Sequence, residues 1–126
     1  MITLSGHARM VTSVAAAGDG HVLTGSYDQT VKVWRGDELV RTIEAHTGSV
    51  EAVAVLPGGA RFISGSRDDT AKLFTFGGEL ERTFEVGSDV LCVAALPDGV
   101  HFVVGLGGAR GLNKGEFRLY LSLIHI

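Results

Sequence analysis

The chain has 126 residues, of which 45% are hydrophobic and 20% charged, a composition that excludes the low-hydrophobicity signature of a disordered segment. Its formal net charge is −3 with both signs interspersed, so no basic stripe is available to neutralise a row of phosphates. The apolar stretches are far shorter than the ~20 residues that span a bilayer. We therefore expect a folded protein with no nucleic-acid partner and no membrane insertion.

The single cysteine and the N-terminal sequence both indicate an intracellular protein. Cys92 lies in the alternating run 90–96, where we expect a small buried side chain rather than a reactive thiol. One cysteine cannot form an internal disulfide framework. No charged segment followed by an apolar one opens the chain, as a signal peptide would require. We expect a reducing compartment, the cytoplasm.

Turn signals divide the chain into short apolar blocks. Eighteen glycines cluster between these blocks, which is typical of tight turns, and the blocks lack the three-to-four spacing of an amphipathic helix. The first set of predicted strands covers residues 11–16, 21–26, 30–35 and 39–44. A second set lies within 50–85 and a third begins further on, so the chain is expected to be all-β.

The same pattern recurs with a period of about 40 residues. Residues 11–34 recur as 50–74, and the third copy, from Val90, carries extra residues before the strand that ends at Tyr120. Each copy predicts a four-stranded antiparallel sheet with two apolar faces, which must stack on like neighbours to bury them. The blades of a β-propeller meet that requirement.

Three motifs make the repeat specific: SGH at 5–7, LTGSYDQTVKVW at 23–34 and ISGSRDDTAKLF at 63–74. Together they resemble the WD-repeat family, although Trp34-Arg35 and Phe74-Thr75 stand in place of the dipeptide that names it. The resemblance implies a partial β-propeller of three four-stranded antiparallel blades, the third lacking a recognisable fourth strand. The implied units are a stray outer strand of a closing or preceding blade at 1–5, repeats at 6–44, 45–85 and 86–126, an insertion at 106–114 and an atypical end at 121–126.

Three blades do not close a ring, because propellers have four to eight. We therefore expect the isolated chain to self-associate or to need further blades, and the natural chain to continue to about seven blades. The final residues 121–126, LSLIHI, contain no turn residue, whereas the family would continue there into a turn and a fourth strand.

The resemblance also assigns a structural role to a set of polar residues. In the family, a His before the first strand, an Asp in the turn between the second and third strands, a hydroxyl residue and a Trp form a hydrogen-bonded chain. Such half-buried groups lose free energy unless they are paired. In the second unit Phe74 replaces the indole, so the network is expected to stop at the hydroxyl. The implied members are His7, Thr24, Asp28 and Trp34 in the first unit, and His46, Ser64 and Asp68 in the second.

Other chemistries fit these residues less well. His7, Asp28 and a serine could form a hydrolytic triad, but the same set recurs in the next unit, as a structural repeat would produce. The five histidines lack the short spacing of a zinc site. The glycine-rich run 105–111 lacks a complete phosphate-binding pattern and leads into a strand. We expect no catalytic residue, no metal and no cofactor.

The family resemblance places partner proteins on the face formed by the turns between second and third strands and by the connections between units. The insertion is expected to project from the same side. Two functions are consistent with this arrangement: a scaffold for protein–protein interaction, and an enzyme or small-ligand binder that uses the central channel of a longer propeller. The first strands of the three units offer Glu51 as their only acidic or basic side chain, which favours the scaffold. The candidate partner-binding residues are Met10, Thr12, Tyr27, Ser49, Glu51, Arg67, Asp89 and Leu91.

Overall fold

Alternating apolar blocks separated by turns form strands throughout the part of the chain that the structure describes. The computed structural model describes residues 5–17, 19–58, 61–98 and 101–107. Every regular element within them is a β-strand, which confirms the all-β prediction. The strands are β1 (Val11–Ala16), β2 (His21–Ser26), β3 (Thr30–Arg35), β4 (Glu38–Glu44), β5 (Val50–Val55), β6 (Arg61–Ser66), β7 (Thr70–Thr75), β8 (Leu80–Glu85), β9 (Val90–Ala95) and β10 (Phe102–Leu106).

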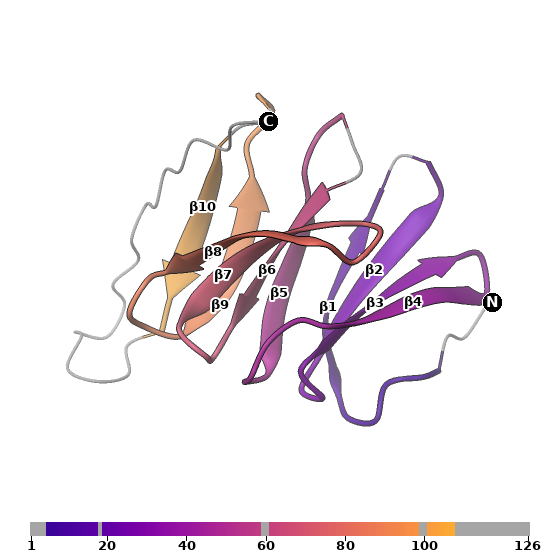
Figure 1. The fold of residues 1–126 in the computed structure, drawn as a ribbon, viewed down its shortest axis with the longest axis horizontal. Coiled ribbons are helices and arrows are strands. Elements are labelled where there is room, and N and C mark those ends of the chain that lie inside the picture. Colours follow the sequence, from indigo (N-terminus) through magenta and orange to yellow (C-terminus); the bar gives the residue numbers. More distant parts are fainter. Residues whose placement is uncertain (1–4, 18, 59–60, 99–100, 108–126) are drawn as a thin grey trace.

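The strands form antiparallel sheets in sequence order (Figure 1). Blade one has the order β1-β2-β3-β4 and blade two the order β5-β6-β7-β8, while β9 pairs with β10 in blade three. These sheets confirm the predicted partial propeller of four-stranded antiparallel blades. Three predicted features lie mostly or wholly outside the described residues. They are residues 1–4 of the stray strand predicted at 1–5, the part of the insertion that follows residue 107, and the atypical end at 121–126.

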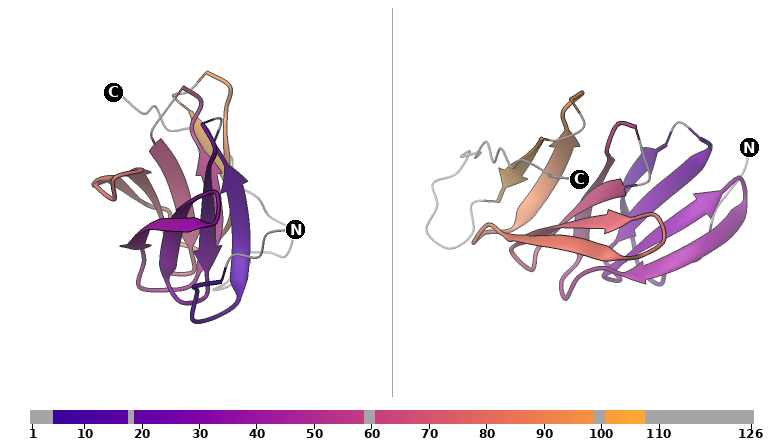
Figure 2. Two further views of the ribbon diagram at one scale, coloured as in Figure 1. Left: turned by 90° about the vertical axis from the view of Figure 1, so that its right-hand side faces the viewer. Right: turned by 45° about the horizontal axis from the view of Figure 1, so that its top comes forward.

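The blades stack with their first strands together. Strand β5 contacts both β1 and β9, and the outer strands β4 and β8 spread away from this side (Figures 1 and 2). Two hydrophobic cores fill the spaces between the sheets. One includes Leu23 and Phe62, between blades one and two, and the other includes Ile63 and Phe102, between blades two and three. Stacking therefore buries both faces of blade two.

Two glycines allow the close approach of neighbouring blades. A Cβ atom on Gly25 of β2 would lie 2.7 Å from Val50 Cγ1, and one on Gly65 of β6 would lie 2.4 Å from Val90 Cγ1. Real side-chain carbons do not approach so closely, so only glycine fits. Val50 and Val90 are consequently 0% exposed, whereas Val11, at the same repeat position in β1, is 46% exposed.

The prediction that Cys92 is buried is wrong, because this side chain is exposed. Its neighbour in β10 is Gly105, where an added Cβ would lie against the Cys92 sulfur, so no side chain there covers the thiol. Ala52, at the same repeat position in β5, is buried. The difference arises because β9 packs beside β5, while no strand among the described residues packs on the far side of β9.

Candidate functional site

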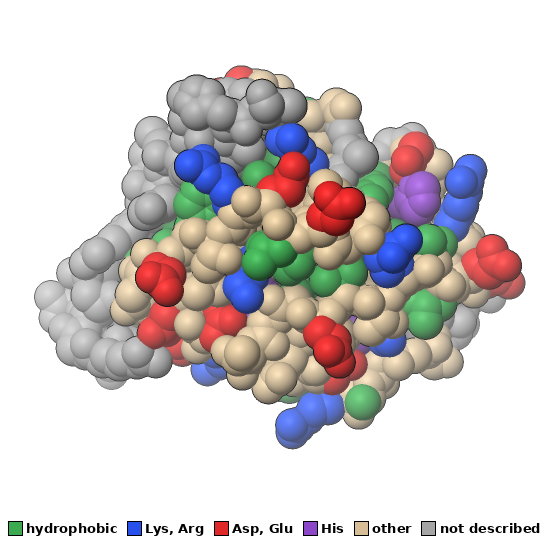
Figure 3. Space-filling model, viewed as in Figure 1, with side chains coloured by type: hydrophobic (Ala, Val, Ile, Leu, Met, Phe, Trp, Pro, Cys, Tyr) green, Lys and Arg blue, Asp and Glu red, His purple; other side chains and the backbone are tan. Residues whose placement is uncertain are grey.

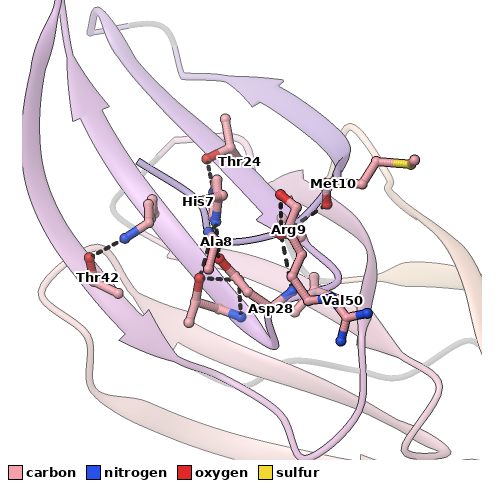
Figure 4. Close-up of polar contacts among 12 residues, drawn as sticks. His7, Ala8, Arg9, Met10, Thr24, Asp28, Thr42 and Val50 are labelled. Atoms are coloured by element: carbon pink, nitrogen blue, oxygen red, sulfur yellow. Dashed lines mark hydrogen bonds and ion pairs between the residues drawn. The ribbon is translucent and has the colours of Figure 1, made fainter. Parts of the chain in front are cut away.

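A chain of polar side chains links the start of blade one to its β2–β3 turn (Figure 4). His7 lies before β1, and its Nδ1 is 2.9 Å from Asp28 Oδ2 while its Nε2 is 2.6 Å from Thr24 Oγ1. The indole of Trp34 donates its Nε1–H to the same Thr24 hydroxyl at 2.9 Å. The structure thus brings together all four residues that the family resemblance implies for this unit.

The hydrogen bonds form a continuous chain from the indole to the carboxylate. The Trp34 indole can only donate, so Thr24 Oγ1 accepts from it and also bonds to His7 Nε2. An ionised carboxylate can only accept, so His7 Nδ1–H donates to Asp28. Each of these side chains thus has a partner within the blade.

Blade two repeats the arrangement without the indole. His46 Nδ1 lies 2.8 Å from Asp68 Oδ2, and His46 Nε2 lies 2.7 Å from Ser64 Oγ. Phe74 stacks on Phe62 instead of donating a hydrogen bond. Within the described residues, the hydrogen bonds from the His46 ring reach no further than the Ser64 hydroxyl on that side.

Hydrogen bonds keep the two aspartates ionised. Burial opposes ionisation of Asp28, but donors from the Thr30 hydroxyl, the His7 ring and two backbone amides outweigh it and hold the pKa of Asp28 well below its usual range. The pKa of Asp68 is lowered in the same way, against burial, chiefly by the Thr70 hydroxyl and by His46. Burial lowers the pKa of His46, in agreement with a neutral ring.

These networks are unsuited to nucleophilic catalysis. The hydroxyls that face the imidazoles belong to Thr24 and Ser64, which are 7% and 0% exposed, so a substrate cannot reach them. The carboxylates serve the backbone as well, because Asp28 accepts from the amide of Thr30 at 3.0 Å and Asp68 from that of Thr70 at 3.0 Å. The arrangement holds the turns in place.

Sequence reasoning missed several members of these turns. Ser26 Oγ accepts from the amide of Asp28 and donates to the carbonyl of Met10, and Ser66 Oγ accepts from the amide of Asp68 in the same way. Thr30 and Thr70 complete the carboxylate contacts. Both serines and both threonines recur at matching positions in the two units, and that recurrence was the available signal.

A repeated irregularity in the first strands contains three of the predicted partner-binding residues. The pairing register shifts between Val11 and Ser13, between Val50 and Ala52, and opposite Leu91 in the β9–β10 pair. A bulge of this kind leaves one residue unpaired and redirects its side chain. The residues at the three bulges are Thr12, Glu51 and Leu91.

The predicted partner-binding residues fall into exposed and engaged groups. Met10, Tyr27, Leu91 and Arg67 are exposed. Thr12, in contrast, is engaged in the seam between blades, because its hydroxyl donates to the carbonyls of Gly25 and Val50. The turns that carry the set gather along the lower edge of the ribbon in Figure 1.

The remaining three residues form a charge cluster around Arg67. Its Nε lies 2.9 Å from Glu51 Oε1, and its Nη1 lies 3.8 Å from Asp89 Oδ2 in blade three. Ser49 Oγ donates to Glu51 at 3.2 Å. The hydrogen bond to Glu51 is the main reason that the pKa of Arg67 is raised. Sequence reasoning missed Arg9 and Gln29, which line a surface hollow with Tyr27, Ser49 and Arg67.

The described residues offer neither a metal site nor a membrane-spanning helix. No group of three or more His, Cys, Asp and Glu side chains there is placed to hold a metal ion. The described part of the chain also contains no helix long and apolar enough to cross a membrane. In the first strands, the carboxylate of Glu51 is committed to Arg67 and Ser49.

Stacked four-stranded antiparallel blades with a repeated His–Asp–hydroxyl network define a repeat protein of the β-propeller class. The chain belongs to the WD-repeat family: the profile described as "WD domain, G-beta repeat" matches residues 1–35 and 37–75.

Several curated proteins are similar to the chain. Pre-mRNA-processing factor 19 homolog 2 of Arabidopsis thaliana is 36% identical over 122 residues, covering 89% of this chain and 23% of that protein. A guanine nucleotide-binding protein subunit beta of Arabidopsis thaliana is 37% identical over 75 residues, covering 56% of this chain and 20% of that protein. Apoptotic protease-activating factor 1 of Rattus norvegicus is 30% identical over 123 residues, covering 94% and 9%. The chain thus spans less than a quarter of the length of each of these relatives.

Proposed function

We propose that the chain is a segment of an interaction scaffold that presents its turns to partner proteins and catalyses no reaction. One observation carries the proposal. The repeated histidine, aspartate and hydroxyl side chains hold the turns. Met10, Tyr27 and Leu91, on the edge that these turns form, are exposed and belong to neither hydrophobic core. Exposed aromatic and apolar side chains on a rigid framework are typical of protein interfaces.

The relatives support a role in assembly. The guanine nucleotide-binding protein subunit beta is by its name a component of a larger protein. The two networks have no accessible nucleophile, which supports a role without catalysis. The lone cysteine supports the proposal that the scaffold works inside the cell, in the cytoplasm.

Site-specific photo-crosslinking tests the proposal. A benzophenone amino acid replaces Tyr27 on the proposed face, and in a matched control it replaces Asp37, an exposed residue in the β3–β4 turn at the other end of the strands. Irradiation of cells that express each variant is expected to give discrete protein adducts from position 27 and few from position 37. Equal adducts from both positions, or none from position 27, would contradict a partner-binding face at these turns.

A further inference from the structure

A hollow lies on the proposed face where blade one meets blade two. It is lined by Arg9, Tyr27, Gln29, Ser49 and Arg67. These side chains come from the segment before β1, the β2–β3 turn, the segment before β5 and the β6–β7 turn. Each carries at least one N–H or O–H donor and none is acidic. The lining therefore matches a ligand that is rich in acceptors.

Arg67 is held so that its guanidinium, rather than its acidic partners, meets the solvent. The side chains of Glu51 and Asp89 are 10% and 15% exposed, whereas that of Arg67 is 53% exposed. The two carboxylates thus lie beneath the cation and fix its orientation. An arginine that is already ordered loses less side-chain entropy when it binds a ligand.

Arg9 supplies a second cation from the other blade. The neighbouring carbonyl of Met10 accepts from Ser26 Oγ at 2.9 Å, which ties this segment to β2. The ion pairs found among the described residues do not include the Arg9 guanidinium. Figure 4 shows the Arg9 side chain directed away from Thr24 and the ring of His7. Its charge is available to a ligand in the hollow.

We propose that this hollow binds an oxyanion on a side chain of a partner protein, either a carboxylate or a phosphate. The proposal rests on the scaffold function above and names the chemistry of the partner. Guanidinium groups bind such oxyanions through paired N–H donors, and the Tyr27 hydroxyl and Gln29 amide can donate to the remaining acceptors.

A nucleic acid fits the same surface less well. Two arginines line the hollow, whereas a nucleic-acid backbone requires a row of cations to neutralise successive phosphates. Figure 3 shows basic and acidic side chains interspersed over the face drawn there, with no continuous basic area. A single anionic side chain is the ligand that matches the two guanidinium groups that line the hollow.

Fluorescence anisotropy with synthetic peptides tests the inference on the 126-residue chain. The probes are a fluorescein-labelled Gly/Ser nonapeptide, its versions with a central Glu pair or a central phosphoserine, and labelled oligothymidine. We expect the glutamate or phosphoserine peptide to bind at least ~10-fold more tightly than the uncharged one, because charge-assisted pairs are the strong hydrogen bonds. The better of the two arms identifies the natural anion.

Three arginine variants make the test specific. Arg9→Gln and Arg67→Gln are each expected to weaken binding of the charged peptide at least ~10-fold, and Arg67→Lys, which keeps the charge over Glu51 and Asp89 but loses the fork, to weaken it less. Arg35→Gln, at an exposed arginine at the far end of β3, is the matched control and should leave binding unchanged. Thermal midpoints of all variants check that the blades remain folded.

Several outcomes would overturn the inference about the anion without contradicting the proposed scaffold function, which the crosslinking experiment tests. Equal binding of charged and uncharged peptides, or no binding of any peptide, would show that the hollow does not select anions. Tighter binding of oligothymidine would assign it to nucleic acid. If Arg35→Gln weakened binding of the charged peptide as much as Arg9→Gln and Arg67→Gln, the binding would come from general charge attraction and not from the hollow. Crosslinking at these turns reports any bound protein, whatever its charge, so it tests the scaffold function by a different readout.

Discussion

Replacing Gly65 by alanine should disrupt the seam between blades two and three. The added Cβ would lie 2.4 Å from Val90 Cγ1 and 3.1 Å from Val93 Cγ1, whereas carbon atoms in contact are normally ~3.5–4.0 Å apart. Val90 is fully buried, so it cannot turn into solvent. Overpacking of this kind costs ~1–3 kcal/mol, and the size of this overlap places Gly65→Ala near the upper end.

A double-mutant cycle isolates the contact. Val90→Ala removes the clashing methyl group and by itself costs ~1.6 kcal/mol for two buried carbons, plus a cavity term. Combined with Gly65→Ala it should cost less than the sum of the single changes by ~1–3 kcal/mol. Urea unfolding followed by the fluorescence of Trp34, the single tryptophan, measures each value.

Gly77→Ala is the matched control. A Cβ there would have only the Thr75 hydroxyl oxygen nearby, at 3.6 Å, and the residue has no positive φ angle to strain. It should be neutral or stabilise by up to ~1 kcal/mol, because alanine restricts the unfolded chain. Strict additivity of Gly65→Ala and Val90→Ala, or equal effects at positions 65 and 77, would refute the close contact.

Three further predictions concern the turns. Asp28→Ala and Asp68→Ala should each destabilise the chain by ~1–3 kcal/mol, since each removes the carboxylate that accepts from a buried histidine ring and from a turn amide; two variants as stable as the parent in urea would contradict this. Stability should fall as the pH drops below 6.5, because the unfolded chain then takes up a proton at His46 that burial disfavours in the folded one. It should fall further below ~4, where the unfolded aspartates protonate first. Urea midpoints at pH 5.5 and 7.5 test the first step, and His46→Gln should flatten it; a pH-independent midpoint would refute it. Gln29→Gly should stabilise the chain by up to ~1 kcal/mol, because Gln29 has a φ of 75° that glycine adopts freely. A loss of stability measured by calorimetry would contradict this and would mean that the hydrogen bond from the Gln29 side-chain amide to the Thr47 carbonyl contributes more than the backbone strain costs.

The strands could be predicted from local signals. Alternation and turn residues specify an antiparallel strand over short distances, and the segments expected in the first unit agree with β1–β4, apart from a start at Glu38 rather than Leu39 in β4. The contacts of His7 with Asp28 and Thr24 could not be predicted from such local signals. Nothing in their separation along the chain brings them together, so they could be anticipated only through the family resemblance.

Features that depend on how neighbouring blades pack could not be predicted from the sequence. Cys92 alternates like a buried residue, but its exposure is decided by which strand packs beside β9. Arg9 and Gln29 look like ordinary loop residues, and they share a hollow with Arg67 only because blade one stacks on blade two. Such positions become visible once the order and spacing of the sheets are known.

The division of blade two between the two cores has a consequence for strand pairing. Phe62 belongs to the core shared with blade one, and Ile63, the next residue of β6, to the core shared with blade three. Shifting the pairing of β6 by one residue would turn each of its side chains to the opposite face. Phe62 would then point into the core shared with blade three, and Ile63 into the core shared with blade one. A blade with shifted pairing would therefore pack poorly against both of its neighbours, so the stacking of blades favours the correct pairing within each sheet.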